Sequence, residues 1–201
     1  MAGADIDYRI ALISMLSLLT GIRAFFRVRT RTLRERIFSD RAERGLNALW
    51  VALGTPLLAS VFAFIFEPGM VTWSSFPLAP PLRWAGAALG LTAVFLILEV
   101  HLELGANFSP TLRLLPDHSL VTTGLYRWVR HPMYSSYFLL FAGAGLLTAN
   151  WLIGGTGLGI IISQMTIRVP REERILQERF GGAHGVYAAA TGKFFPRIRP
   201  W

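Results

Sequence analysis

Five apolar segments constrain the fold of this chain more than any other feature of its sequence. They cover Ile6–Phe26, Leu46–Phe66, Leu82–Val100, Ser136–Ala149 and Leu152–Val169. A helix of about 20 mainly apolar residues is long enough to cross the hydrocarbon core of a bilayer. The whole chain is 53% hydrophobic and 16% charged, which is too apolar for a typical soluble domain. The sequence therefore predicts an all-α, polytopic membrane protein with about five transmembrane helices.

The last two apolar segments are short for complete spans, and we interpret them as a helical hairpin that turns at Asn150-Trp151. Small residues are common where membrane helices meet, because they let two backbones approach closely. The hairpin contains six of them: Gly143, Gly145, Gly154, Gly155, Gly157 and Gly159. We expect close packing there rather than local flexibility.

The segment after Val169 is polar, with an apolar stripe formed by Ile175, Leu176 and Phe180. It predicts a C-terminal helix on the cytoplasmic side that ends at Gly181-Gly182. No linker or repeat divides the chain, so we expect one domain over residues 1–201. Residues 1–100 would form three membrane helices, and residues 101–201 a second part that contains the motifs described below.

Basic residues alternate between connections, and this pattern predicts the orientation in the membrane. The first and third loops and the C-terminal segment are rich in arginine, whereas residues 67–81 and the hairpin turn contain no basic residue. Cytoplasmic loops carry an excess of Lys and Arg. We therefore expect the N-terminus outside and the C-terminus and functional site in the cytoplasm, in a bacterial or archaeal inner membrane. The net charge of +8 is then a topology and lipid-headgroup signal, and we expect no nucleic acid partner.

Several kinds of site are unsupported by the sequence. The chain has no cysteine, which excludes disulfides and thiolate metal sites. Glu99, His101 and Glu103 follow the third predicted helix, but their spacing does not match a zinc-binding helix, and we expect no metal. Neither a glycine-rich phosphate loop nor a Gly-x-Ser-x-Gly nucleophile turn is present.

The segment from Gly124 to Tyr134 places two tyrosines, two arginines, a histidine and a proline directly before an apolar helix. Pro132 suits the first helical turn, where its missing N–H is not needed. The aromatic residues alone are typical of a bilayer interface. Together with His131, however, they surround a helix N-terminus, which is suited to an anionic group such as a carboxylate. Both interpretations stay open on the residues alone.

Arg168 and Glu172 are four residues apart and share a helix face. They form either an ordinary ion pair where the helix leaves the membrane or a functional pair. In the functional case, the carboxylate would hold an ammonium group of a cofactor, and the arginine would hold a substrate carboxylate by two hydrogen bonds.

The motifs of the second half of the chain resemble the isoprenylcysteine carboxyl methyltransferase family, which shares its C-terminal signature with membrane phospholipid methyltransferases. They are Leu104-Gly-Ala-Asn-Phe-Ser, the run from His118 to Tyr134, Arg168-x-x-x-Glu172-Glu173, Phe180-Gly181 and Tyr187. The resemblance covers about Leu104 to Pro196, roughly half of the chain.

This resemblance implies S-adenosyl-L-methionine as cofactor, with S-adenosyl-L-homocysteine as product. It places these residues at the cofactor: His118, Ser119, Leu120, Val121, Tyr126, His131, Pro132, Met133, Tyr134 and Glu172, with Arg113 as a further contact. It places Arg168 toward the substrate.

The expected function is methyl transfer to a lipophilic substrate that enters laterally from the bilayer, with carboxyl O-methylation of an isoprenylcysteine-like substrate favoured. A carboxylate is already ionised at neutral pH, whereas an amine would require a base, and no residue stands out as one. Methylation of a phospholipid or another small lipid, an NADPH-dependent membrane reductase and a non-catalytic scaffold stay open. The sequence leaves the oligomeric state open as well.

Overall fold

The computed structural model describes residues 2–29, 41–105 and 119–197. All regular elements of these residues are helical. The α-helices are α1 (Ala2–Arg29), α2 (Arg41–Phe66), α3 (Pro80–Leu104), α4 (Pro132–Thr148), α5 (Trp151–Ser163), α6 (Val169–Phe180) and α7 (Gly182–Ala190). Two 3-10 helices, η2 (Pro68–Ser74) and η4 (Gly124–Arg127), and a π-helical turn, η5 (Gln164–Arg168), complete the described elements.

The length and the surface of these helices confirm the predicted class, an all-helical membrane protein. Among the described residues, four helical stretches are long and apolar enough to cross a bilayer: Ile6–Val28, Ala48–Phe66, Pro80–Leu104 and Trp151–Phe180. Large apolar side chains cover their outer faces, and Leu58, Phe62 and Phe95 are 71%, 64% and 58% exposed. Lipid tails are the medium in which such a surface is stable, since exposed apolar area is unfavourable in water.

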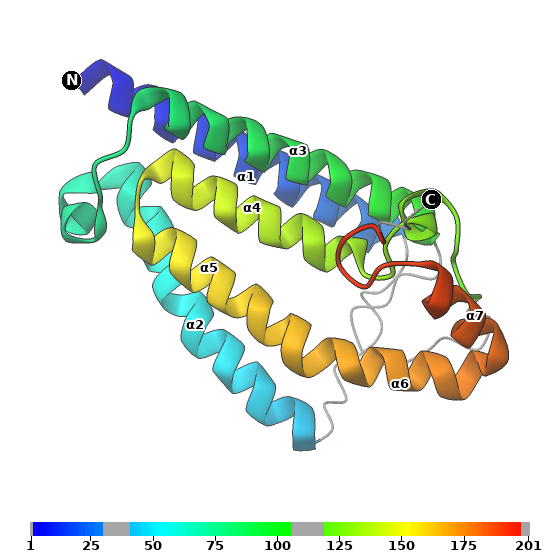
Figure 1. The fold of residues 1–201 in the computed structure, drawn as a ribbon. Coiled ribbons are helices and arrows are strands. Elements are labelled where there is room, and N and C mark those ends of the chain that lie inside the picture. The colour runs from blue at the N-terminus through cyan, green and yellow to red at the C-terminus, as the bar shows by residue number, and fades with distance from the viewer. Residues whose placement is uncertain (1, 30–40, 106–118, 198–201) are drawn as a thin grey trace.

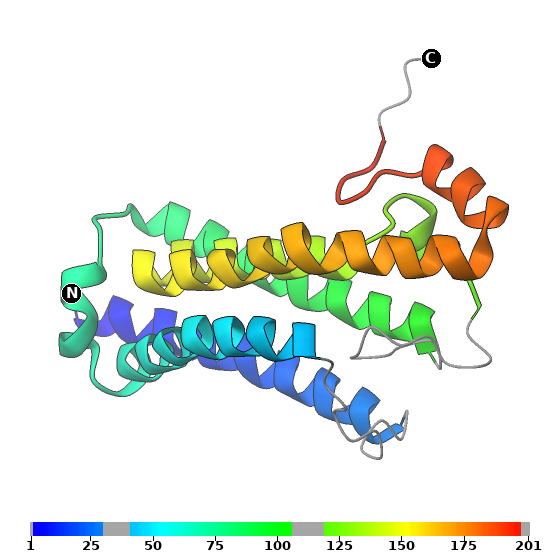
Figure 2. The same ribbon diagram turned by 90° about the horizontal axis from the view of Figure 1, so that it is seen from below.

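The helices pack around a core between α1, α3, α4 and α5. The most buried large side chains include Leu12 and Met15 on α1, Ile97 on α3, Leu147 on α4 and Ile153 on α5. α3 and α4 lie side by side, α5 packs on the other side of α4, and α2 packs against α5 (Figures 1 and 2). The helix that begins with α5 continues without a break through η5 and α6.

Glycines allow the closest approaches between α4 and its neighbours. A Cβ atom added at Gly145 would lie 2.8 Å from the Cα atom of Gly154 across the α4–α5 contact, and one at Gly143 would lie 2.7 Å from the Gly86 carbonyl of α3. A Cβ at Gly157 would overlap the ring of Phe141. The expected close packing is thus confirmed for Gly143, Gly145, Gly154 and Gly157. It is wrong for Gly155 and Gly159, where nothing lies within 4 Å.

The predicted hairpin turn is confirmed, and Asn150 stabilises it. Its fully buried side chain accepts hydrogen bonds from the backbone N–H groups of Leu152 and Ile153, at 3.0 and 3.1 Å, and so caps α5. Its amide also donates to the Val71 carbonyl at 3.1 Å and to the Ser74 hydroxyl at 2.7 Å. The turn is therefore attached to η2, which lies at the same end of the bundle (Figure 1).

One helix boundary differs from the prediction, and one predicted continuation is explained by the structure. α3 continues to Leu104 and ends at Gly105, whose φ of 49° favours glycine, so Glu99, His101 and Glu103 lie on the helix rather than after it. The fifth apolar helix and the C-terminal helix are continuous, because the η5 turn accommodates Pro170. In this turn the Val169 N–H bonds to the Gln164 carbonyl, five residues back. α6 ends at Gly181, as predicted.

The ends of α1, α3 and α6 and the start of α4 gather at the end of the bundle opposite to the hairpin turn (Figures 1 and 2). α7 and the segment that follows it lie at this same end. The candidate site is built there.

Candidate functional site

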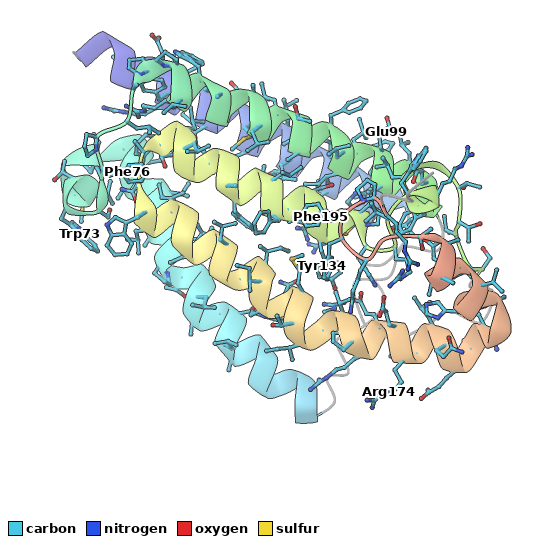
Figure 3. The ribbon with its side chains drawn as sticks, viewed as in Figure 1. Trp73, Phe76, Glu99, Tyr134, Arg174 and Phe195 are labelled. Carbon is cyan, nitrogen blue, oxygen red and sulfur yellow. The ribbon has the colours of Figure 1, made fainter. Side chains whose placement is uncertain are left out.

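The candidate site joins two segments that lie far apart in the sequence, the start of α4 and the start of α6. His131 is the residue directly before α4, and Tyr134 lies in the first turn of this helix. Arg168 is the last residue of η5, and Glu172 and Glu173 lie in the first turns of α6. Figure 3 shows Tyr134 between α4 and the α5–α6 helix, whereas Arg174 of α6 points away from the bundle.

Glu172 is the centre of the first cluster. Its Oε1 atom accepts hydrogen bonds from the Tyr134 hydroxyl at 2.7 Å and from Arg168 Nε at 2.9 Å. Its Oε2 atom lies 3.8 Å from His131 Nδ1 and accepts no hydrogen bond from the described residues. The predicted Arg168–Glu172 pair is therefore present, and one oxygen of its carboxylate keeps its capacity to accept a donor.

Glu173 is the centre of the second cluster. Its Oε1 atom lies 3.0 Å from Arg130 Nε and 3.2 Å from His131 Nε2, and its Oε2 atom lies 3.4 Å from Lys193 Nζ. Arg130 also donates to the carbonyls of Ala188 and Thr191, at 2.9 and 2.6 Å. This cluster fixes the turn before α4 against both α6 and the C-terminal segment.

Backbone hydrogen bonds strengthen the same junction. The N–H groups of Arg130 and His131 donate to the carbonyls of Gly192 and Lys193, at 2.9 and 3.1 Å. The Gly192 N–H donates to the Trp128 carbonyl at 3.1 Å. From the sequence, Phe194-Phe195-Pro196 is expected at the membrane surface, but none of these contacts could be predicted, because neither a motif nor a periodicity indicates what the segment around Lys193 pairs with.

Two tyrosines connect η4 to α7. The Tyr187 hydroxyl donates to the Tyr126 carbonyl at 2.8 Å. Burial raises the pKa of Tyr187 to about 12 and also raises the pKa of Tyr126. Both phenols are therefore protonated at neutral pH, and the Tyr187 hydroxyl can donate its hydrogen bond to the Tyr126 carbonyl. Glu103 of α3 holds the other side of this turn, since both of its carboxylate oxygens accept the Leu125 N–H, at 2.7 and 2.9 Å.

The structure brings four of the predicted site residues into one network: His131, Tyr134, Arg168 and Glu172. Pro132 and Met133 start α4 beside them, and Tyr126 lies in η4. Ser119, Leu120 and Val121 lie in the segment that leads into η4. His118 and Arg113 lie outside the described residues. The role of Glu173 was missed, and its position next to Glu172 was the available signal.

The Glu172 carboxylate fits a cofactor that carries an ammonium group. Glu172 Oε2 is an acceptor on a carboxylate, and a carboxylate is the group that pairs best with a cationic donor. Tyr134 and Arg168 hold this carboxylate from the other oxygen, so its orientation is set before any ligand binds. Such preorganisation limits the entropy that binding would cost.

Comparison with known proteins gives the same assignment as the motifs. Residues 87–178 match the family model of the isoprenylcysteine carboxyl methyltransferase family. The protein-S-isoprenylcysteine O-methyltransferase B of Arabidopsis thaliana is 28% identical over 154 residues, which are 74% of this chain and 73% of that protein. A probable protein-S-isoprenylcysteine O-methyltransferase of Oryza sativa subsp. japonica is 30% identical over 47% of this chain and 50% of the relative.

A bacterial relative has a name that gives a different methyl acceptor. The methanethiol S-methyltransferase of Pseudomonas deceptionensis is 34% identical over 122 residues, 59% of this chain and 45% of that protein. The chain thus spans about half of the length of several curated relatives that it matches.

A solved structure of a eukaryotic intramembrane Ras methyltransferase, an isoprenylcysteine carboxyl methyltransferase, superposes with a TM-score of 0.50 at 23% sequence identity. The match covers 81% of this chain and 55% of that chain. The family resemblance and the shared membrane fold are both confirmed.

Proposed function

We propose, for a chain that resembles the isoprenylcysteine carboxyl methyltransferase family and has its fold, that the protein is a membrane methyltransferase that depends on S-adenosyl-L-methionine. The preferred reaction is carboxyl O-methylation of an isoprenylcysteine-like, lipophilic substrate at the cytoplasmic face of the membrane. The arrangement of Tyr134, Arg168 and Glu172 around one carboxylate is the single observation that best supports this proposal.

When bound, S-adenosyl-L-methionine supplies a methyl group activated by a sulfonium. Glu172 Oε2 is the acceptor for its ammonium group, because this oxygen faces the site and carries no other hydrogen bond among the described residues. The family resemblance adds Ser119, Leu120, Val121 and Tyr126 to the cofactor side, with His131, Pro132, Met133 and Tyr134 at the start of α4. It also adds His118 and Arg113.

Arg168 holds the substrate in this proposal. Glu172 binds its Nε atom at 2.9 Å and thereby orients the plane of the guanidinium. A guanidinium recognises a carboxylate through two parallel N–H donors. The charged pair lies where the helix leaves its apolar segment, and charged groups at such a position are costly unless they have a role.

The carboxylate acceptor needs no base, because it is ionised at neutral pH. The protein then contributes by positioning the two reactants in line and by excluding water. Orientation alone can supply on the order of 7–11 kcal/mol of the barrier.

One experiment separates the two roles. Substitution of Glu172 by Gln removes the charge that holds the ammonium, and we expect the affinity for S-adenosyl-L-homocysteine to fall about 10- to 100-fold, the range for a hydrogen bond to a charged group. Arg168→Ala should lower methyl transfer to an S-prenylated N-acetylcysteine by a much larger factor than it lowers the affinity for S-adenosyl-L-homocysteine, because the Tyr134 hydroxyl still holds Glu172 in this variant. Calorimetry and transfer of a labelled methyl group provide the two readouts.

Arg174→Ala is the matched control, since it removes a charge from the exposed side of the same helix. Equal changes in Glu172→Gln and Arg174→Ala would contradict the assignment. Stabilisation by NADPH but not by S-adenosyl-L-homocysteine would favour a reductase, and binding of neither would favour a scaffold. If the cofactor binds, mass spectrometry of lipids and thiols from treated membranes identifies the acceptor, phospholipids included.

A further inference from the structure

His131 lies between the two acidic clusters and contacts both. Its Nε2 atom is 3.2 Å from Glu173 Oε1, and its Nδ1 atom is 3.8 Å from Glu172 Oε2. The residue is only 7% exposed. The two nitrogens of one imidazole therefore face two different carboxylates, of which one belongs to the proposed reaction site and the other to the structural junction.

The hydrogen bonds determine which nitrogen carries the proton. An ionised carboxylate can only accept, so the contact with Glu173 requires a hydrogen on Nε2. Arg130 and Lys193 hold Glu173 in place from the other side. In the neutral imidazole, Nδ1 is then the atom with the free electron pair. This atom faces Glu172, which binds Arg168 and Tyr134.

A histidine that is oriented by a carboxylate, with its second nitrogen toward the reactants, is the arrangement of a general base. The same carboxylate stabilises the imidazolium that forms when the base takes a proton. Here a second carboxylate, Glu172, lies within 4 Å of the nitrogen that would receive this proton. The protonated state of His131 would thus have an acidic partner on each side.

We propose that His131, positioned by Glu173, is a general base, and that the site also methylates lipophilic thiols. This inference rests on the proposed methyltransferase function. A carboxylate acceptor makes no use of a base, so the pair of His131 and Glu173 matters only for an acceptor that must lose a proton.

The charges around the site favour a thiol over an amine. An ammonium has a pKa of about 10.4, whereas a thiol has a pKa of about 8.5, closer to the value of about 6.5 for imidazole. A thiol is uncharged when it arrives from the bilayer, and the anion that it forms during the reaction is attracted by Arg168.

A bond forms between the thiol sulfur and the methyl carbon, and the bond between this carbon and the sulfonium sulfur breaks, with its electron pair left on that sulfur. The thiol proton passes to His131 Nδ1. The products are a methyl thioether, S-adenosyl-L-homocysteine and an imidazolium that later releases its proton to solvent.

The other groups around His131 do not prevent it from acting as a base. Tyr134 and Phe194 place their rings 6.0 and 5.9 Å from the imidazole. His184 of α7 is close enough to interact electrostatically with His131, and burial lowers the pKa of His184, so it is largely neutral at neutral pH. The charged groups that face His131 are Arg130, Glu172 and Glu173, and Lys193 lies behind Glu173, 3.4 Å from its Oε2 atom.

The test compares two acceptors in the same purified protein. We would measure methyl transfer from labelled S-adenosyl-L-methionine to 1-decanethiol and to an S-prenylated N-acetylcysteine, and take the ratio of the two rates. Use of a ratio cancels any effect on cofactor binding. The His131→Gln variant keeps an N–H donor for Glu173 but has no base, and Glu173→Gln keeps the shape but lacks the charge. We expect the thiol-to-carboxylate ratio to fall about 100-fold in His131→Gln and to fall in Glu173→Gln, with no change in Arg174→Ala.

The pH dependence gives a second readout. In His131→Gln, thiol methylation should follow ionisation of the thiol alone and should therefore depend more steeply on pH than in the wild type. Methylation of the carboxylate acceptor should have the same pH dependence in both proteins. A wild type that methylates the carboxylate but not the thiol would overturn this inference and leave the proposed function standing. So would an equal loss with both acceptors in His131→Gln, since His131 would then act only as a structural link. Transfer to neither acceptor, without binding of S-adenosyl-L-homocysteine, would refute the proposed function itself.

Discussion

At the scale of single residues, His184 shows how the C-terminal part of the chain depends on the protonation of one group. The side chain is 4% exposed, and its Nδ1 atom lies 2.8 Å from the Gln177 side-chain oxygen. An amide oxygen accepts, so Nδ1 carries a hydrogen, and the buried Nε2 atom has no partner among the described residues. Burial lowers the pKa of His184, and the nearby Glu173 carboxylate offsets part of this effect.

The lowered pKa of His184 makes the stability of the protein depend on pH. The unfolded chain binds the proton with a pKa of about 6.5, and the folded chain binds it less readily. Stability is therefore complete above about pH 6.5 and decreases as the pH falls below it. We expect the melting temperature in detergent to drop between pH 7.5 and pH 5.5, and to drop less in His184→Phe, which cannot titrate. An equal drop in both proteins would show that other groups cause the effect.

A contact between two side chains could be predicted from the sequence where the two residues lie close together in the chain. The i, i+4 spacing of Arg168 and Glu172 predicted their pairing, which is present at 2.9 Å. The contacts of Glu173 with Arg130, His131 and Lys193 join segments that are 20 or more residues apart. Nothing in a local pattern indicates such partners, because they depend on how the helices assemble.

At the scale of elements, the contact between α4 and α5 depends on two facing glycines. The backbones approach so closely that a Cβ atom at Gly145 would lie 2.8 Å from Gly154 Cα, whereas one at Gly155 meets nothing within 4 Å. Both positions are helical, so alanine would gain a similar helix propensity at each. Their difference in stability isolates the helix contact.

We expect Gly145→Ala to lower the free energy of unfolding by about 1–3 kcal/mol, the usual cost of excess volume in a packed region. Gly155→Ala should be neutral or slightly stabilising. Thermal unfolding of the two variants in the same detergent measures the difference. Similar melting temperatures would mean that the two helices can separate at no cost.

The existence of the helices was predictable from hydropathy, but their ends were not. α3 extends four residues past the predicted Val100, since polar Glu99, His101 and Glu103 continue the helix until Gly105 ends it. The apolar fifth segment and the polar helix after it are one continuous helix. The hydropathy of the sequence changes at this point, but the helix continues, because a π-helical turn accommodates Pro170.

At the scale of the whole molecule, the C-terminal segment closes the site against the turn before α4. Arg130 binds Glu173 and the carbonyls of Ala188 and Thr191, and Lys193 binds Glu173 as well. Ser135 adds a hydrogen bond to the Phe194 carbonyl. The last described residues of the chain thus hold α6 and α4 in their relative positions.

Loss of Arg130 should release this segment. In Arg130→Gln we expect trypsin to cleave after Lys193 about 10- to 100-fold faster, because hydrogen bonds to a charged group contribute about 1.5–3 kcal/mol. Arg127→Gln, an exposed change in the neighbouring turn, serves as the control. Mass spectrometry of the fragments locates the cut. Identical rates in the two variants would show that Arg130 does not hold the segment.

The class of the molecule follows from composition and apolar segment length, and its resemblance to a methyltransferase family follows from the motifs between Leu104 and Tyr187. The site lies at the end of the bundle where α4 begins and where the continuous α5–α6 helix leaves its apolar segment. Its assignment to the cytoplasmic face of a bacterial or archaeal membrane stays a prediction that rests on the arginine distribution.

The hairpin of α4 and α5 also bears on how the protein is made. From Pro132 to Ile167 the chain contains no acidic or basic residue, and Asn150 satisfies the first backbone N–H groups of α5 within the turn. The ribosome can therefore deliver both helices to the insertion machinery as one unit, and the tip can translocate without dragging a charge through the lipid. If the site faces the cytoplasm, as the distribution of arginine predicts, the basic residues from Arg168 onward would stop the transfer and keep the site on the side where synthesis takes place.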